Sequence, residues 1–139
     1  MLRLSKLVLL AGIAIISLFS LAQFTPVEAT SATGSQNPNL TVFVSLSPDR
    51  ATVGDTITVT QSVTNNSSAA LTVTLTDTLK VPSGHSYTAS RTVTLTPGTH
   101  SKTFSYAVQP YFPKGDYYLT LTATNQGSSS SATAEVTIF

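Results

Sequence analysis

The sequence predicts an all-β protein, an immunoglobulin-like antiparallel β-sandwich of seven or eight strands, preceded by an N-terminal signal-peptide helix. From Leu40 onward, short segments alternate between apolar and hydroxyl-bearing side chains, the period expected of strands with one buried face. Turn sequences such as Pro97-Gly98 and Asn125-Gln126-Gly127 separate these segments. No segment after the leader has helical periodicity, and evenly spaced short strands favour a sandwich over an α/β fold.

The first 29 residues have the parts of a secretory signal peptide. Arg3 and Lys6 form a basic start, and the apolar run from Leu7 is about 15 residues long, short of the ~20 that a membrane-spanning helix needs. Small residues permit cleavage after Ala22 or after Ala29, and we favour Ala29. Retention as an anchor is the alternative. Cleavage predicts a secreted or cell-envelope protein, extracellular or periplasmic, with no membrane contact beyond the leader.

The rest of the chain predicts one domain. Residues 30–39 are polar and contain Gly34 and Pro38, so we expect a flexible lead-in before a sandwich domain over residues 40–139. Inside it, apolar residues such as Leu71, Val73 and Leu75 alternate with threonines. Strands are expected at residues 40–47, 56–65, 70–79, 92–96, 100–108, 115–125 and 132–138, with a short edge strand within 85–90.

Tyr117 opens the most regular of these strands. It follows the turn sequence Pro113-Lys114-Gly115 and precedes the core residue Leu119 by two positions. This placement matches the tyrosine corner of immunoglobulin-like sandwiches, where the ring is buried and the hydroxyl bonds backbone a few residues upstream. We therefore predict a structural role for Tyr117.

Composition narrows the classes of function. After Ala29 there are five basic and five acidic side chains, and a neutral chain has no electrostatic footprint for nucleic acid. There is no cysteine, which excludes disulfides and thiolate metal sites and favours a prokaryotic envelope over an animal secretory route. The chain has 24 Thr and 19 Ser, so hydroxyl groups must keep its surface soluble.

Several stretches resemble a known group of domains. Leu46-Ser47-Pro48 is followed by Val53-Gly54-Asp55-Thr56-Ile57, and further on by Leu95-Thr96-Pro97-Gly98 and Gly115-Asp116-Tyr117-Tyr118-Leu119. These resemble CARDB-type (cell-adhesion-related) and fibronectin-III-like domains of bacterial and archaeal surface proteins, over about residues 40–139. The resemblance implies the fold and a surface location. It implies no single activity, because such domains serve as spacers, adhesion modules and companions of enzymes.

Catalytic and metal-binding patterns are missing from the sequence. His85 and His100 each adjoin a serine, but in a serine-rich chain such adjacency is expected by chance, and a nucleophile needs an oriented base. Asp49 and Asp55 could meet at one end of the sandwich as calcium ligands, although each more simply stabilises its own turn. We therefore expect no cofactor, no metal and no enzymatic activity.

Aromatic residues outside the core phase are the candidates for surface contacts. Phe43, Tyr118 and Tyr111 are the foremost of them, and exposed rings on a rigid sandwich can stack on sugars or anchor a protein. Alternatively, Tyr111 packs with Phe112 against the flanking prolines to close the end of the sandwich.

The function predicted from the sequence is an exported, non-enzymatic immunoglobulin-like binding or structural module of the cell surface, acting by protein–protein contact or assembly. One version polymerises by strand addition at an unpaired edge, with Leu40–Ser47 as the segment of interest. The alternative is a carbohydrate-binding module that uses exposed aromatic residues.

Overall fold

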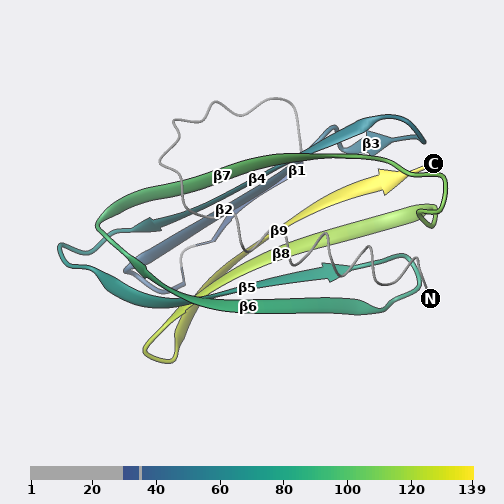
Figure 1. Ribbon diagram of the computed structural model, residues 1–139. Helices are drawn as coiled ribbons and strands as arrows, with labels where there is room; N and C mark the ends of the chain where they lie inside the picture. Colours follow the sequence, from purple (N-terminus) through teal and green to yellow (C-terminus); the bar gives the residue numbers. More distant parts are fainter. Residues whose placement is uncertain (1–29, 35) are drawn as a thin grey trace.

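A computed structural model describes residues 30–34 and 36–139, and the predicted leader, residues 1–29, lies outside the described residues. The described chain forms a two-sheet β-sandwich without a helix (Figure 1). Its strands are β1 (Thr30–Gly34), β2 (Leu40–Ser47), β3 (Arg50–Ala51), β4 (Thr56–Asn65), β5 (Leu71–Lys80), β6 (Ser86–Leu95), β7 (Gly98–Ala107), β8 (Gly115–Asn125) and β9 (Ser128–Ile138). Within the described ranges, no helix is long and apolar enough to span a bilayer.

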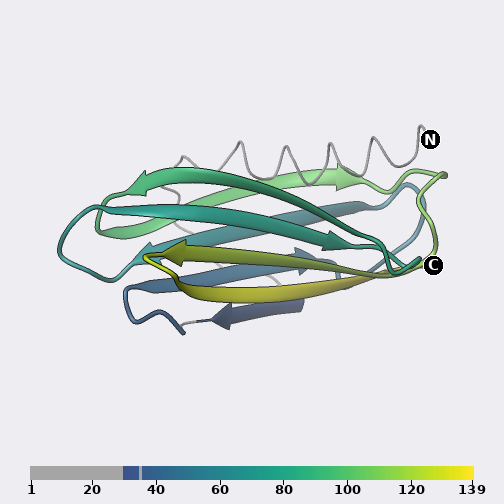
Figure 2. The same cartoon turned by 90° about the horizontal axis from the view of Figure 1, so that it is seen from below.

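The two sheets have four and five strands. The first, sheet A, has the order β1-β2-β4-β7, and the second, sheet B, has the order β3-β9-β8-β5-β6. All pairings are antiparallel except that β3 pairs parallel to β9, over Arg50 and Ala51. Figure 2 shows β6 and β7 along one side of the sandwich and β1 and β9 along the other.

The strand count differs from the predicted seven or eight, because the described residues form nine strands. Two of these, β1 and β3, were not predicted. In the opposite direction, the expected pieces at 85–90 and 92–96 are one ten-residue strand, β6, which pairs with β5 without a break. The inward positions Tyr87, Ala89 and Arg91 of β6 are only half-buried, which explains why their polarity does not alternate like that of a core strand.

The predicted flexible lead-in over residues 30–39 is wrong. Residues 30–34 form β1, which pairs with β2 from Thr30 opposite Leu46 to Gly34 opposite Val42. The loop that follows is tied to the far end of the chain. The backbone N–H of Asn37, a buried residue, donates to Ser130 Oγ at 2.8 Å, and the Asn37 side chain donates to the carbonyl oxygen of Ser128 at 3.0 Å.

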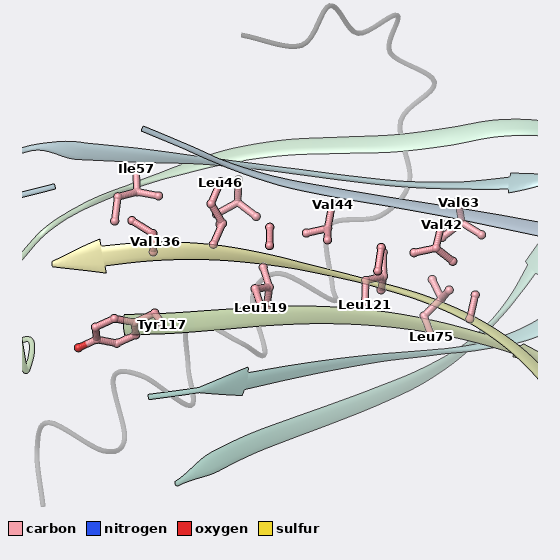
Figure 3. Packing of buried hydrophobic residues seen from close by; sticks show 14 of the residues in the cluster. Val42, Val44, Leu46, Ile57, Val63, Leu75, Tyr117, Leu119, Leu121 and Val136 are labelled. Carbon is pink, nitrogen blue, oxygen red and sulfur yellow. The ribbon is translucent and has the colours of Figure 1, made fainter. Parts of the chain in front are cut away.

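The core lies between the sheets and is built from alternate residues of the longer strands. Figure 3 shows inward side chains from both sheets, with Leu46 and Val44 of β2 facing Leu119 and Leu121 of β8. These four are buried, as are the inward residues of β9. Because inward and outward residues alternate along each strand, a shift of register by one residue would turn all of these core side chains toward solvent.

The two long sides of the sandwich differ in how closely the sheets approach. On the β1–β9 side, Gly34 lies so close to the backbone of Ser131 that a Cβ at position 34 would overlap the Ser131 carbonyl oxygen. On the β6–β7 side, the inward side chains are larger and half-buried, including Tyr87, Phe104 and Tyr106. The sandwich is therefore sealed by backbone on one side and by aromatic side chains on the other.

Both outer faces carry hydroxyl groups joined in cross-strand pairs. On sheet B, Thr76 bonds Ser90 at 2.9 Å and Thr120 bonds Thr133 at 2.7 Å. Similar hydroxyl pairs join β5 to β6, β8 to β9 and, on sheet A, β4 to β7. Threonine is well suited to this position because its branched side chain favours strands and its hydroxyl remains on the wet face.

Candidate interaction site

Tyr117 holds the connection between the sheets at the end of β7. Its ring is buried, with 4% of its surface exposed, and its hydroxyl donates to the carbonyl oxygen of Pro113 at 2.6 Å. Burial raises the pKa of Tyr117 to about 12, which keeps the donor proton in place. The turn itself needs Gly115, because its φ of 126° lies where side chains are disfavoured and a Cβ there would lie 2.9 Å from Pro82 Cβ. This is the geometry predicted for a tyrosine corner.

The three candidate contact residues lie on three different parts of the molecule. Phe43 is on the outer face of sheet A, in register with Thr33 and Ser62. Tyr118 is on the outer face of sheet B. Tyr111 is in the β7–β8 connection, where its ring meets that of Phe112 edge-to-face at 5.3 Å. Phe43 and Tyr118 cannot form one patch, because the two sheets turn these faces in opposite directions.

Phe112 and Tyr118 have different surroundings. Phe112 packs against the core, so this aromatic pair helps to close the end of the sandwich. Tyr118 is half-buried in a row of polar side chains, between Lys80 of β5 and Glu135 of β9. The Glu135 carboxylate raises the pKa of Tyr118, with smaller contributions from burial and from Asp116. Tyr118 is thus an aromatic ring flanked by charged hydrogen-bonding groups.

The β6–β7 side offers two long sheet edges. In the part of the chain that the structure describes, β6 pairs only with β5 and β7 pairs only with β4, each over ten residues in unbroken register. Edges of this length can accept a further strand. Each has one inward, half-buried cation, Arg91 on β6 and Lys102 on β7, and inward charges oppose indiscriminate pairing.

Leu40–Ser47, the segment of interest for strand addition, does not lie at the edge of a sheet. This segment is β2, which has β1 on one side and β4 on the other. Its inward residues Leu40, Val42 and Val44 have no exposed surface. An added strand would have to displace β1, whereas the edges of β6 and β7 need no displacement.

The titratable residues considered for catalysis or metal binding lie in turns or beside them, with His100 near the start of β7. Asp55 Oδ2 accepts the backbone N–H of Thr52 at 2.8 Å and its hydroxyl at 2.9 Å, and these bonds lower the pKa of Asp55. His100 Nε2 lies 3.0 Å from the Thr96 carbonyl oxygen, across the β6–β7 turn. Among the described residues, no three His, Cys, Asp or Glu side chains gather where a metal ion could bind.

One polar cluster in the core was not predicted. Asp77 of β5 and Gln61 of β4 have no exposed surface, and Gln61 Nε2 lies 2.6 Å from Asp77 Oδ1. The contact joins the two sheets. The sequence does carry a signal for it, because Asp77 is in phase with the inward residues Leu75 and Leu79, just as Gln61 is in phase with its apolar neighbours.

Comparison with known proteins supports the fold. No protein-family model and no curated protein matches the sequence, but solved structures do match. The CARDB domain of a Pyrococcus furiosus protein, solved in complex with di-metal ions, has a TM-score of 0.52 and 18% identity, and the match covers 85% of this chain and 100% of that domain. The chain therefore has a CARDB-like fold.

Two larger proteins contain a similar domain. The alkylpurine DNA glycosylase AlkC of Pseudomonas fluorescens, bound to DNA with an abasic site analog, matches with a TM-score of 0.53 and 11% identity, over 72% of this chain and 30% of the enzyme. A cycloisomaltooligosaccharide glucanotransferase of Paenibacillus sp., complexed with cycloisomaltoheptaose, matches with a TM-score of 0.50 and 28% identity, over 68% and 13%. This chain thus spans less than a third of either enzyme.

Proposed function

We propose that this protein is an exported, non-enzymatic module of the cell surface or envelope that works by protein–protein contact, including contact with further copies of itself. The observation that carries the proposal is the pair of long edges on the β6–β7 side, since main-chain groups along an open edge provide affinity for an added strand. The signal-peptide pattern supports export. The CARDB-like fold and the positions of the two histidines and Asp55, in turns or beside them, are consistent with a role that needs no catalytic group.

The inward cations narrow the choice of partner strand. Arg91 and Lys102 are half-buried next to the edges that an added strand would occupy. A strand with an acidic side chain facing either cation gains a cross-strand ion pair, whereas a basic strand is repelled. The edges therefore favour a neutral or acidic partner strand.

Self-association can be tested by adding charge to one edge. Ser90 lies near the middle of β6 on the outer face. If copies pair edge to edge through β6, Ser90→Lys places two like charges in neighbouring positions, which costs about 0.2–1 kcal/mol per contact and weakens association several-fold. The measurement is the concentration dependence of mass by size-exclusion chromatography with light scattering.

The matched control is Thr122→Lys, on the same outer face but on the interior strand β8; its association should equal that of the parent protein. If both variants weaken self-association equally, the contact involves the outer face of sheet B and not the edge of β6. A parent protein that remains monomeric at high concentration would remove the self-assembly version and leave contact with a different protein.

Carbohydrate binding is the second candidate function, and the surroundings of Tyr118 favour it. A ring beside Lys80 and Glu135 combines a stacking face with hydrogen-bonding groups. One matching domain belongs to an enzyme solved with an oligosaccharide. If this candidate is correct, Tyr118→Ala abolishes retention on an immobilised polysaccharide, while Phe43→Ala, on the opposite face, leaves retention unchanged. Retention that survives Tyr118→Ala would exclude the site.

A further inference from the structure

The acid–amide contact in the core lacks the partners that an ionised carboxylate needs. Asp77 has no exposed surface, and its Oδ1 contacts Gln61 Nε2. Asp77 Oδ2 and Gln61 Oε1 are both buried without a hydrogen-bond partner, and so is the hydroxyl of Tyr87 nearby on β6. A buried charge without compensating hydrogen bonds is among the most expensive features of a protein interior.

The length of the contact also favours a neutral acid. The 2.6 Å between Asp77 Oδ1 and Gln61 Nε2 is shorter than the roughly 2.7–3.2 Å of N–H···O bonds and falls within the roughly 2.5–3.0 Å of O–H···O bonds. The amide oxygen and nitrogen of glutamine have nearly the same shape, so the side chain can present its oxygen at the same position. A carboxylic O–H donating to the amide oxygen then explains the distance.

Four charged or titratable side chains face the interior from the two neighbouring edge strands. Tyr87 and Arg91 face inward from β6, and Lys102 and Tyr106 face inward from β7. Arg91 and Lys102 are half-buried at the rim, and Asp77 Oδ2 accepts no hydrogen bond from either of them. The inward residues of β2 and β8 around the contact are apolar, among them Val44 and Leu121.

We propose that the folded protein holds Asp77 as a neutral carboxylic acid, hydrogen-bonded across the two sheets to Gln61. Folding then takes up a proton, and the folded protein is most stable at acidic pH. The electrostatics agree with the geometry. Burial raises the pKa of Asp77 to about 7, even with the Gln61 amide nitrogen as the donor, an arrangement that lowers this pKa. A charge at Asp77 would in turn act on Tyr106, whose pKa is raised to about 12 by burial and then by Asp77.

The direction of the pH dependence follows from these values. Below pH 3.8, the ordinary value for Asp, both the folded and the unfolded chain hold the proton. Between about pH 4 and pH 7 the unfolded chain has released it and the folded chain has not, so stability falls as the pH rises. Above the folded pKa both forms are ionised, and the stabilisation by the proton is fully lost.

The test uses the protein purified after secretion from an expression host. Carbon-13 NMR of the aspartate carboxyl groups should show one that titrates near pH 7, and the Asp77→Asn variant should lack that signal. In urea titrations, the unfolding equilibrium constant should rise by up to tenfold per pH unit between about pH 4.5 and pH 6.5, which corresponds to about 1.4 kcal/mol per unit. Asp77→Asn should abolish this slope.

Asp49→Asn, at an exposed position, is the matched control and should keep the slope of the parent protein. The NMR titration needs no variant, so the proposal stays testable even if Asp77→Asn does not fold. It is overturned if every aspartate carboxyl of the folded protein titrates below pH 5, or if stability is constant from pH 4.5 to pH 6.5.

Discussion

At the scale of single residues, Tyr117 both packs in the core and holds a turn. The ring fills space between the sheets and the hydroxyl holds Pro113, so one side chain orders both the strand and the connection before it. The sequence is sufficient to predict this role, because the Tyr stands beside a turn signal and in phase with Leu119 and Leu121.

Removing only the hydroxyl isolates the corner. Tyr117→Phe keeps the ring and leaves the Pro113 carbonyl without its donor, so we expect a loss of about 0.5–1.5 kcal/mol of unfolding free energy. The measurement is the urea midpoint. Tyr118→Phe is the control on the neighbouring outer-face position, and its midpoint should move less. An unchanged midpoint in Tyr117→Phe would show that the hydrogen bond contributes nothing to stability.

Asp77 shows where single-residue prediction fails. Its phase along β5 places it inward, but the partner Gln61 lies sixteen positions away on the other sheet. Periodicity identifies the face of a strand that a residue occupies and does not identify which strand faces it. The sequence therefore identifies Asp77 as an unusual polar residue on the inward face, but it does not identify the hydrogen-bond partner of Asp77.

At the scale of elements, β1 was the strand least open to prediction. Its sequence, Thr30 to Gly34, has no apolar alternation, and the loop after it is held by Ser130, 93 positions away along the chain. In contrast, β4, β5, β8 and the part of β9 from residue 132 onward were predicted because their periodicity is long and regular. β6 was divided in two because Arg91 interrupts the apolar positions of a strand that lies at an edge.

The attachment of β1 depends on a glycine. Gly34→Ala would drive a Cβ into the Ser131 carbonyl, and overpacking of this kind costs about 1–3 kcal/mol. We expect a lower urea midpoint together with faster hydrogen exchange of the β1 amides, since β1 must move off β9. Thr33→Ala, one residue earlier and exposed, is the control. Exchange at β1 that matches the parent protein in Gly34→Ala would contradict the close approach.

At the scale of the whole molecule, the arrangement of strands decides which surfaces are open to a partner. The sandwich fold follows from the sequence pattern. The order of strands within each sheet does not, and this order makes β6 and β7 edges and places β2 inside a sheet. The same order separates Phe43 from Tyr118 on opposite faces, so candidates that looked equivalent along the chain are alternatives in space.

The paired threonine and serine hydroxyls of the outer faces have a consequence for the environments in which the protein can work. Water is held at these faces by neutral dipoles, and screening by dissolved ions acts only on charges. The hydration of these hydroxyl groups is therefore nearly the same at low and at high salt. We expect the solubility of the domain to depend less on salt concentration than that of a protein whose surface is covered by lysine and glutamate.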